Sequence, residues 1–253
     1  MKQYALSLAI LLAVSSAAAA QKTDPPKTNA DSKPGAATIP VPAPITDKSN
    51  PTDLAKAALA ALGGDNFKKM KSSFIQGDVN LYAPNQTQAL PGKFAIATAG
   101  DKFRVDISAA PVFVFKDIYD GVRSQSNVPG IELPPPSKFG LPMLSKFEQG
   151  GYTVSAIPDK KKLRGFRIVD GEGNTTDYYI DPATARIAEY VIPYGDSTFG
   201  STITKYAEID GVLIPMNFTQ KFAVPGQGDY YAEYKAKSAK LNGPIGDDVF
   251  MVQ

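Results

Sequence analysis

The sequence predicts an α+β domain built on one large antiparallel β-sheet. Helical spacing of apolar residues is confined to residues 53–72 and to a short segment near residue 145. From Ser73 onward apolar and polar residues mostly alternate, which is typical of antiparallel strands with one buried and one solvated face. Gly, Asp and Pro separate these segments at short intervals. We therefore expect about ten or eleven strands in one sheet, with helices packed against it.

The first twenty residues have the layout of a secretory signal peptide. Lys2 precedes an apolar run from Tyr4 to Val14, and three alanines, 18–20, supply the small residues of a cleavage site. The run is shorter than the roughly twenty residues that span a bilayer, so we expect cleavage rather than a membrane anchor. Because the chain contains no Cys to carry a lipid, we expect a periplasmic protein that is not lipid-anchored.

Residues 21–52 are rich in Pro, Ala, Lys, Thr and Ser and carry only three large aliphatic residues, Ile39, Val41 and Ile45. Such a composition cannot bury enough apolar surface to offset the ordering entropy of the segment. We expect a Pro-rich disordered tether, either a spacer or a passive leader. A single domain over residues 53–253 follows it.

The domain is expected to begin with two helical pieces. Thr52 or Asp53 is the expected N-cap of the first, whose apolar residues recur at helical spacing up to Leu62. Two glycines, 63 and 64, then end that helix. A second piece from Asp65 to about Ser72 buries two apolar side chains and exposes its lysines.

A third helix is expected inside an insertion between Ser124 and Gly151. Three prolines, 134–136, interrupt the strand pattern there, and residues 142–149 then show helical spacing. An insertion of this length among short strands is often a lid or a binding element. We interpret it as a lid.

The strands are expected from alternation between turns, and the first of them, Ser73 to Tyr82, shows the pattern clearly. Its apolar residues would face the core and its polar residues the solvent. The full expected set covers residues 73–82, 94–98, 103–107, 112–119, 153–157, 164–169, 176–180, 186–193, 201–209, 217–222 and 230–236.

The composition excludes several classes of chemistry. The chain has no His, no Cys and no Trp. Ser–His–Asp hydrolysis, thiolate chemistry and Cys-ligated metal centres are therefore excluded. The 27 basic and 25 acidic residues nearly balance, which provides no electrostatic footprint for nucleic acid. We expect a monomeric, non-catalytic protein without a cofactor, a metal site or a nucleic-acid partner.

Two acidic patterns are the remaining candidates for catalysis or metal binding. The turn that begins at Asp170 resembles a calcium loop, but Thr175 occupies the position that requires Gly. We interpret it as a hairpin turn. A hydrolase needs two carboxylates across a cleft, and spacing alone does not pair the candidates. These are Asp117, Asp120, Glu189, Glu208 and Glu233.

Tyrosine is concentrated in the C-terminal strands. A tyrosine side chain combines an apolar ring with a polar tip, which suits the lining of a ligand groove. Ordinary strand composition explains the same residues, and the sequence leaves both interpretations open. The residues are Tyr178, Tyr179, Tyr190, Tyr194, Tyr206, Tyr230, Tyr231 and Tyr234.

Several short motifs are spread along the domain. They are the start at Leu59–Gly64 with the lysine-rich segment 67–71 and Gly77, the strand Phe103–Val105, the turn Tyr119–Gly121, the segment Tyr179–Thr184, the hairpin Tyr206–Pro215 and the close Asp247–Phe250. Together these motifs resemble those of the LolA/LolB-like lipoprotein-carrier superfamily, over residues 51–253. The resemblance implies a strongly curved antiparallel half-barrel covered by helices. It also implies an apolar cavity, which in the characterised carriers accepts the acyl chains of lipoproteins.

We therefore expect a periplasmic protein that binds a lipid or an acylated protein in an apolar cavity between the sheet and the helices. The expected cavity residues are Phe94, Phe103, Val105, Phe113 and Phe115, and the expected lid residues are Met143, Leu144 and Phe147. The alternative is a structural or interaction module of the cell envelope, with a closed core and an envelope protein as its partner. Bulky or polar filling of the concave sheet face would favour that alternative.

Overall fold

The computed structural model describes residues 38–128, 133–224, 226 and 228–252. The predicted signal peptide, residues 1–20, and the first part of the predicted tether lie outside the described residues. The unit from Gly35 to Gln253 is compact, and the account below concerns its described part.

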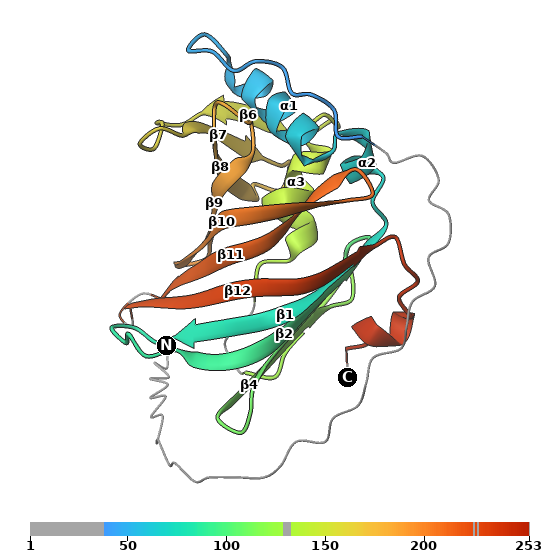
Figure 1. Ribbon diagram of the computed structural model, residues 1–253, viewed down its shortest axis with the longest axis vertical. Coiled ribbons are helices and arrows are strands. Elements are labelled where there is room, and N and C mark those ends of the chain that lie inside the picture. Colours follow the sequence, from blue (N-terminus) through green and yellow to red (C-terminus); the bar gives the residue numbers. More distant parts are fainter. Residues whose placement is uncertain (1–37, 129–132, 225, 227, 253) are drawn as a thin grey trace. The chain divides into compact units, whose positions relative to one another are not determined.

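The described strands form one antiparallel sheet of twelve strands (Figure 1). Its order, β5-β4-β3-β2-β1-β12-β11-β10-β9-β8-β7-β6, is a meander in which the first and last strands pair at the centre. The strands are β1 (Ser72–Tyr82), β2 (Leu90–Ala99), β3 (Lys102–Ala109), β4 (Phe113–Tyr119), β5 (Ser124–Ser126), β6 (Thr153–Ala156), β7 (Arg164–Val169), β8 (Thr175–Ile180), β9 (Ile187–Tyr194), β10 (Ser197–Ile209), β11 (Val212–Val224) and β12 (Gly228–Leu241).

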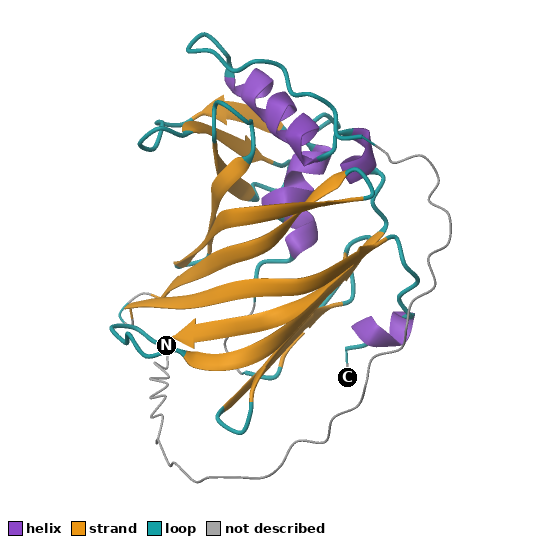
Figure 2. Cartoon of the chain, in the orientation of Figure 1, coloured by secondary structure: helices purple, strands orange, loops and turns teal. Residues whose placement is uncertain are grey.

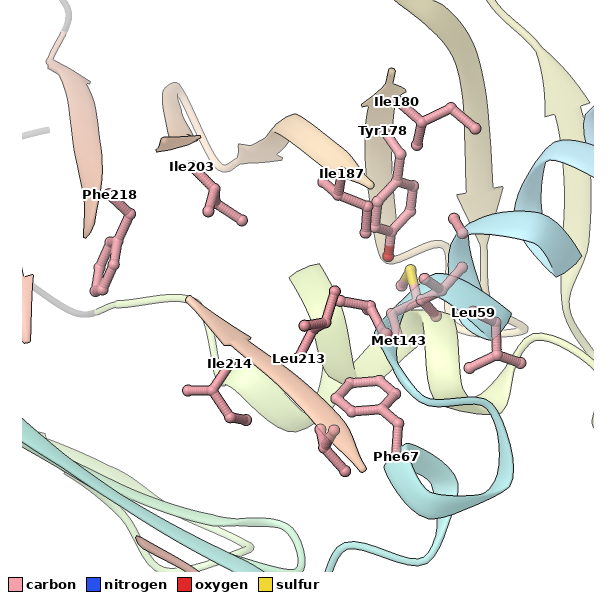
Figure 3. Close-up of a cluster of buried hydrophobic side chains, with 14 of the residues drawn as sticks. Leu59, Phe67, Met143, Tyr178, Ile180, Ile187, Ile203, Leu213, Ile214 and Phe218 are labelled. Carbon is pink, nitrogen blue, oxygen red and sulfur yellow. The ribbon is translucent and has the colours of Figure 1, made fainter. Parts of the chain in front are cut away.

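The expectation of one large antiparallel sheet is confirmed, but two details of it were wrong. The strand count is twelve because β5 has only three residues, too few to show alternation. The sheet is also open, with β5 and β6 as its edges, rather than a strongly curled half-barrel. Bulky side chains of the sheet and the helices fill the space between the two halves of the sheet, as Figure 3 shows for part of it. The apolar core that these side chains form is continuous across both halves, β1–β5 and β6–β12.

The central pairing of β1 with β12 depends on a glycine. The register shifts between Gln76 and Gly77, and a Cβ at residue 77 would lie 2.1 Å from the carbonyl oxygen of Lys235. The two backbones approach each other too closely there for any side chain. Gly77 therefore permits the pairing that joins the two ends of the meander.

The helices are α1 (Pro51–Leu62), α2 (Asp65–Lys68) and α3 (Gly140–Lys146), with short 3₁₀ turns at Pro136–Lys138 and Asp247–Phe250 (Figure 2). The N-cap of α1 is Asn50, not Thr52 or Asp53. Asn50 and Asp53 form a capping box, and Pro51 occupies the first helical position. The predicted end at Gly63 is confirmed. Both α2 and α3 are shorter than predicted.

Residues 38–50, which fall within the predicted tether, contact the domain. Ile39 and Ile45 are partly buried against the main core. The Arg164 guanidinium donates to the carbonyl oxygens of Thr46 at 2.6 Å and Ser49 at 3.4 Å. The folded unit thus begins before the predicted boundary at residue 53, and a tether stays a prediction for residues 21–37.

The helices pack on one face of the sheet, here called the inner face. Helix α1 contacts β6, β7, β11, α2 and α3, and α3 also contacts β9. One continuous apolar core joins these helices to both halves of the sheet. No helix among the described residues has the length and hydrophobicity required to cross a membrane.

Candidate functional site

The inner face of β2, β3 and β4 carries the predicted cavity residues. Phe94, Phe103, Val105 and Phe115 are buried, each between 3% and 8% exposed, and Phe113 is partly buried against them. The alternation of each strand places these side chains on the same face. The structure therefore brings all five together in one apolar cluster.

Helix α3 brings the predicted lid residues to the same cluster. Met143 and Leu144 are at most 1% exposed, and Phe147, directly after the helix, is 6% exposed. Figure 3 shows Met143 between Tyr178 of β8 and Phe67 of α2. The lid residues thus pack into the core and face away from solvent.

The first residue of α3, Gly140, is held by two buried side chains of β8. The Tyr178 hydroxyl donates to its carbonyl oxygen at 2.6 Å, and its own N–H donates to Thr176 Oγ1 at 3.1 Å. Gly140 has a φ of +59°. A Cβ there would lie 3.2 Å from the Tyr190 ring. These contacts fix the position at which α3 begins.

Ion pairs on the surface hold the rest of the lid segment. Lys146 donates to Asp101 at 3.0 Å and to the Ser137 carbonyl oxygen at 3.1 Å. Glu148 pairs with Lys68 of α2. Since exposed ion pairs contribute little each, the predicted lid segment is fixed by buried hydrogen bonds at its start and by weaker pairs at its end.

Residues of the C-terminal strands complete the inner face. Tyr234 is among the tyrosines that the sequence indicated as a possible groove lining, whereas Phe218 was not identified. The rings of Phe218 and Tyr234 stack with centroids 4.6 Å apart, and Phe94 meets Tyr234 edge-on at 4.9 Å. This contact joins predicted cavity residue Phe94 to β11 and β12. Alternation within these strands could have found both residues, had the pairing of β1 with β12 been known.

Most of the eight tyrosines lie on the inner face, and four of them have deeply buried phenols. Burial raises the pKa of each of these phenols: Tyr178, Tyr190, Tyr206 and Tyr234. The Tyr206 hydroxyl donates to the Ile187 carbonyl oxygen at 2.8 Å. Tyr179 and Tyr231, by contrast, have their side chains on the opposite, outer face. The tyrosine-rich strands therefore place tyrosine side chains on both faces of the sheet.

A buried carboxylate fixes the insertion across the inner face. Asp117, 3% exposed, lies in β4 between Phe115 and Tyr119 on the same face. Its Oδ2 accepts the backbone N–H of Leu133 at 3.1 Å. Leu133 in turn packs against the main core. Asp117 thus ties the insertion to the sheet.

Three of the other four candidate acids, Asp120, Glu189 and Glu233, have local partners. Asp120 accepts the N–H groups of the next turn residues, Glu189 pairs with Lys160 at 2.5 Å, and Glu233 accepts from a tyrosine of β1. The turn at Asp170 is a hairpin closed by its own hydrogen bonds. The described residues include no cluster of three or more acidic side chains that could hold a metal ion.

Comparison with known proteins concerns the fold. No protein-family model matches the sequence, and no curated protein is significantly similar to it. Among solved structures, a LolA superfamily protein from Nitrosomonas europaea superposes with a TM-score of 0.50 at 11% identity, over 77% of this chain and 97% of that one.

Two further solved structures superpose less closely. A DUF1329 family protein from Desulfovibrio piger has a TM-score of 0.48 at 8% identity, over 80% of this chain and 98% of that one. An outer-membrane lipoprotein-sorting protein domain from Vibrio parahaemolyticus has a TM-score of 0.46 at 13% identity, over 78% and 97%.

At these identities the likeness establishes the fold and not the activity. The resemblance found in the sequence motifs is thereby confirmed at the level of the fold. The chain has the fold of a LolA superfamily protein.

Proposed function

We propose that the protein is a non-catalytic carrier of the periplasm that binds a lipid or an acylated protein between the inner face of the sheet and α3. The observation that carries this proposal is the packing of α3. Its apolar side chains meet the predicted cavity residues in one cluster, and its polar anchors lie at its two ends. The LolA-like fold supports the same function.

Binding requires α3 to move, because its side chains occupy the space that an acyl chain would fill. Withdrawing Met143, Leu144 and Phe147 from the core costs about 1.5–3 kcal/mol for each side chain. An acyl chain of about fourteen carbons gains about 11 kcal/mol when it replaces them. The two terms are of similar size once the cost of association is included, so a packed inner face is compatible with uptake.

The proposed organisation of the chain follows the same function. Residues 1–20 would direct export and be removed, and residues 21–37 would act as a spacer ahead of the folded domain. The domain itself would then work as a monomer near a membrane or an envelope protein that delivers or receives the cargo.

Uptake of a fluorescent fatty acid, together with native mass spectrometry of the gently purified protein, tests the proposal. Val105→Thr puts a hydroxyl on the inner face with almost no change of shape, and Val114→Thr makes the same change where the side chain is 51% exposed. We expect V105T to weaken uptake about tenfold and V114T to leave it unchanged. A protein that carries no lipid and takes up none contradicts the proposal.

One observation favours the second candidate, an envelope module with a closed core. The inner face is filled by bulky side chains, and Phe166, Leu144 and Tyr178 are all 0% exposed. Under this alternative the protein binds a partner at its surface, and neither variant affects any lipid signal.

A further inference from the structure

A pocket on the outer face of the sheet lies apart from the inner-face site. It is a shallow depression, open to solvent, with a volume of about 330 Å³. It lies where the loop between β1 and β2 meets β11 and β12. Its lining residues are Tyr82, Gln86, Thr87, Thr219, Tyr231 and Glu233.

The pairing of the strands places the two tyrosines side by side. Tyr82 of β1 is directly opposite Tyr231 of β12, and both side chains point away from the inner face. Glu233 lies opposite Thr219 of β11. The pocket therefore has two aromatic rings along one side and hydrogen-bonding groups along the other.

The Glu233 carboxylate of the pocket is held in one orientation by a hydrogen bond from Tyr82. The Tyr82 hydroxyl donates to Glu233 Oε2 at 3.1 Å, and this bond raises the pKa of Tyr82. The phenol therefore stays a donor at neutral pH, and the second oxygen of Glu233 has capacity to accept from a ligand.

The charges around the pocket exclude two ligand classes. Glu233 is the one charged side chain in the lining, and a carboxylate repels an anion such as a phosphate. For a cation, the ring of Tyr231 is unfavourable because the Lys221 ammonium lies 5.9 Å from its centroid. Lys221 also pairs with Asp229 at 2.6 Å, which keeps that ammonium in place.

A purely apolar ligand fits no better, because it would cover the Gln86 amide, the hydroxyls of Thr87 and Thr219 and the second oxygen of Glu233 without offering them hydrogen bonds. A neutral molecule with many hydroxyls matches both sides of the pocket. Its C–H faces would lie on the tyrosine rings, and its hydroxyls would donate to Glu233 and exchange hydrogen bonds with Gln86 and the threonines. We propose that this outer-face pocket binds a short neutral saccharide, either free or as part of a polymer.

The test is a titration of the isotopically labelled protein with chitotetraose, cellotetraose and maltotetraose, followed by NMR. We expect at least one of them to shift the amide signals of the lining residues and not those of α3. Co-sedimentation with insoluble chitin and with peptidoglycan then distinguishes a polymer from a free sugar. Tetramethylammonium and inorganic phosphate are titrated in the same way, as probes for the two excluded ligand classes, cations and anions.

Variants assign the binding to the pocket. Tyr231→Ala removes a ring that is 39% exposed, so folding is not at risk, and it should weaken binding about tenfold. Tyr179→Ala, on the outer face of β8, is the matched control and should change nothing. Glu233→Gln keeps an oxygen for Tyr82 and replaces the second oxygen by an NH2 group, from which a sugar hydroxyl can accept, so most of the binding should remain.

The proposal is overturned if none of the three sugars shifts the lining residues, or if Y231A binds as well as the unchanged protein. It is also overturned if tetramethylammonium binds there and E233Q abolishes that binding, since the ligand would then be a cation. Lipid uptake at the inner face plays no part in these results.

Discussion

The Tyr178 hydroxyl lies 2.6 Å from the carbonyl oxygen of Gly140, so a fully buried side chain of β8 holds the first residue of α3. The two residues are 38 positions apart in the sequence. This hydrogen bond ties the lid segment to the part of the sheet that is most deeply buried. Its strength bears directly on how readily α3 can leave the inner face.

Removal of this hydroxyl tests the bond. Tyr178→Phe leaves the Gly140 carbonyl oxygen buried without its donor and should lower the free energy of unfolding by about 1–3 kcal/mol. Tyr179→Phe, one residue later and on the outer face, is the matched control and should change it little. Urea unfolding measures both, and hydrogen exchange should show faster opening of α3 in Y178F alone. Equal effects of the two variants would mean that the bond does not hold the lid.

The backbone at Gly140 provides a second test. Gly140 and Gly100 share a positive φ, of +59° and +57°, so alanine costs about 1–2 kcal/mol of backbone strain at either. At Gly140 the new Cβ would also press on the Tyr190 ring at 3.2 Å, whereas nothing lies within 4 Å at Gly100. Thermal unfolding should show Gly140→Ala to be the more destabilising variant. The opposite order would contradict the close packing of α3 on β9.

Immobilising the lid tests whether uptake requires it to move. The chain has no Cys, so two introduced cysteines are the sole sites for a thiol reagent. Lys146 Nζ and Asp101 Oδ1 are 3.0 Å apart. In the double variant Lys146→Cys with Asp101→Cys, a bismaleimide that a reductant can cleave should join the two residues. Cross-linking should abolish fatty-acid uptake, and cleavage should restore it. A cross-linked protein that still takes up fatty acid would show that α3 is not the lid.

A second cross-link controls for the chemistry. Lys93 and Lys237 both pair with Asp78 on the outer face, and the corresponding pair of cysteines should accept the same reagent. Uptake should be unchanged by this cross-link, since it joins β2 to β12 away from the lid.

The four buried phenols predict a loss of stability at alkaline pH. Tyrosine in the unfolded chain ionises at about pH 10, and burial raises the pKa of Tyr178, Tyr190, Tyr206 and Tyr234. The stability that these neutral buried phenols contribute is therefore fully present below about pH 10. It is lost as the pH rises toward their pKa values in the folded state. Above about pH 10 the free energy of unfolding should fall by up to about 1.4 kcal/mol per pH unit for each phenol.

Urea unfolding at a series of alkaline pH values measures this slope, and Tyr234→Phe isolates one phenol. The fall in the free energy of unfolding with pH should be shallower for Y234F by up to about 1.4 kcal/mol per pH unit, which corresponds to one proton. An identical slope in the variant would mean that Tyr234 ionises equally in the folded and unfolded states.

Much of the sheet could be predicted because its strands alternate, but the pairing of β1 with β12 could not. Alternation shows which residues of a strand share a face and is silent on which strands are neighbours. The contact of Phe94 with Tyr234 and the outer-face pocket both depend on that pairing. The five predicted cavity residues come from one half of the sheet, and only the pairing shows which side chains of the other half they meet.

Two local features show where sequence signals were weak or overlooked. At the start of β11, Val212, Leu213 and Ile214 are all buried, since this strand contacts α1 as well as its neighbours in the sheet. Alternation is absent there, and the predicted strand began five residues late. The N-cap Asn50 precedes Pro51, a recognised start signal that Thr52 and Asp53 obscured.

The most direct test of the central claim is labelling with a fatty acid that carries a photoreactive diazirine at the end of its chain, followed by peptide mass spectrometry. If the acyl chain binds beneath α3, the label will be found on inner-face residues such as Phe94, Val105 and Phe115 and on Met143 or Phe147 of the lid segment. Label confined to exposed residues such as Val114, or absent from the protein, would contradict the account.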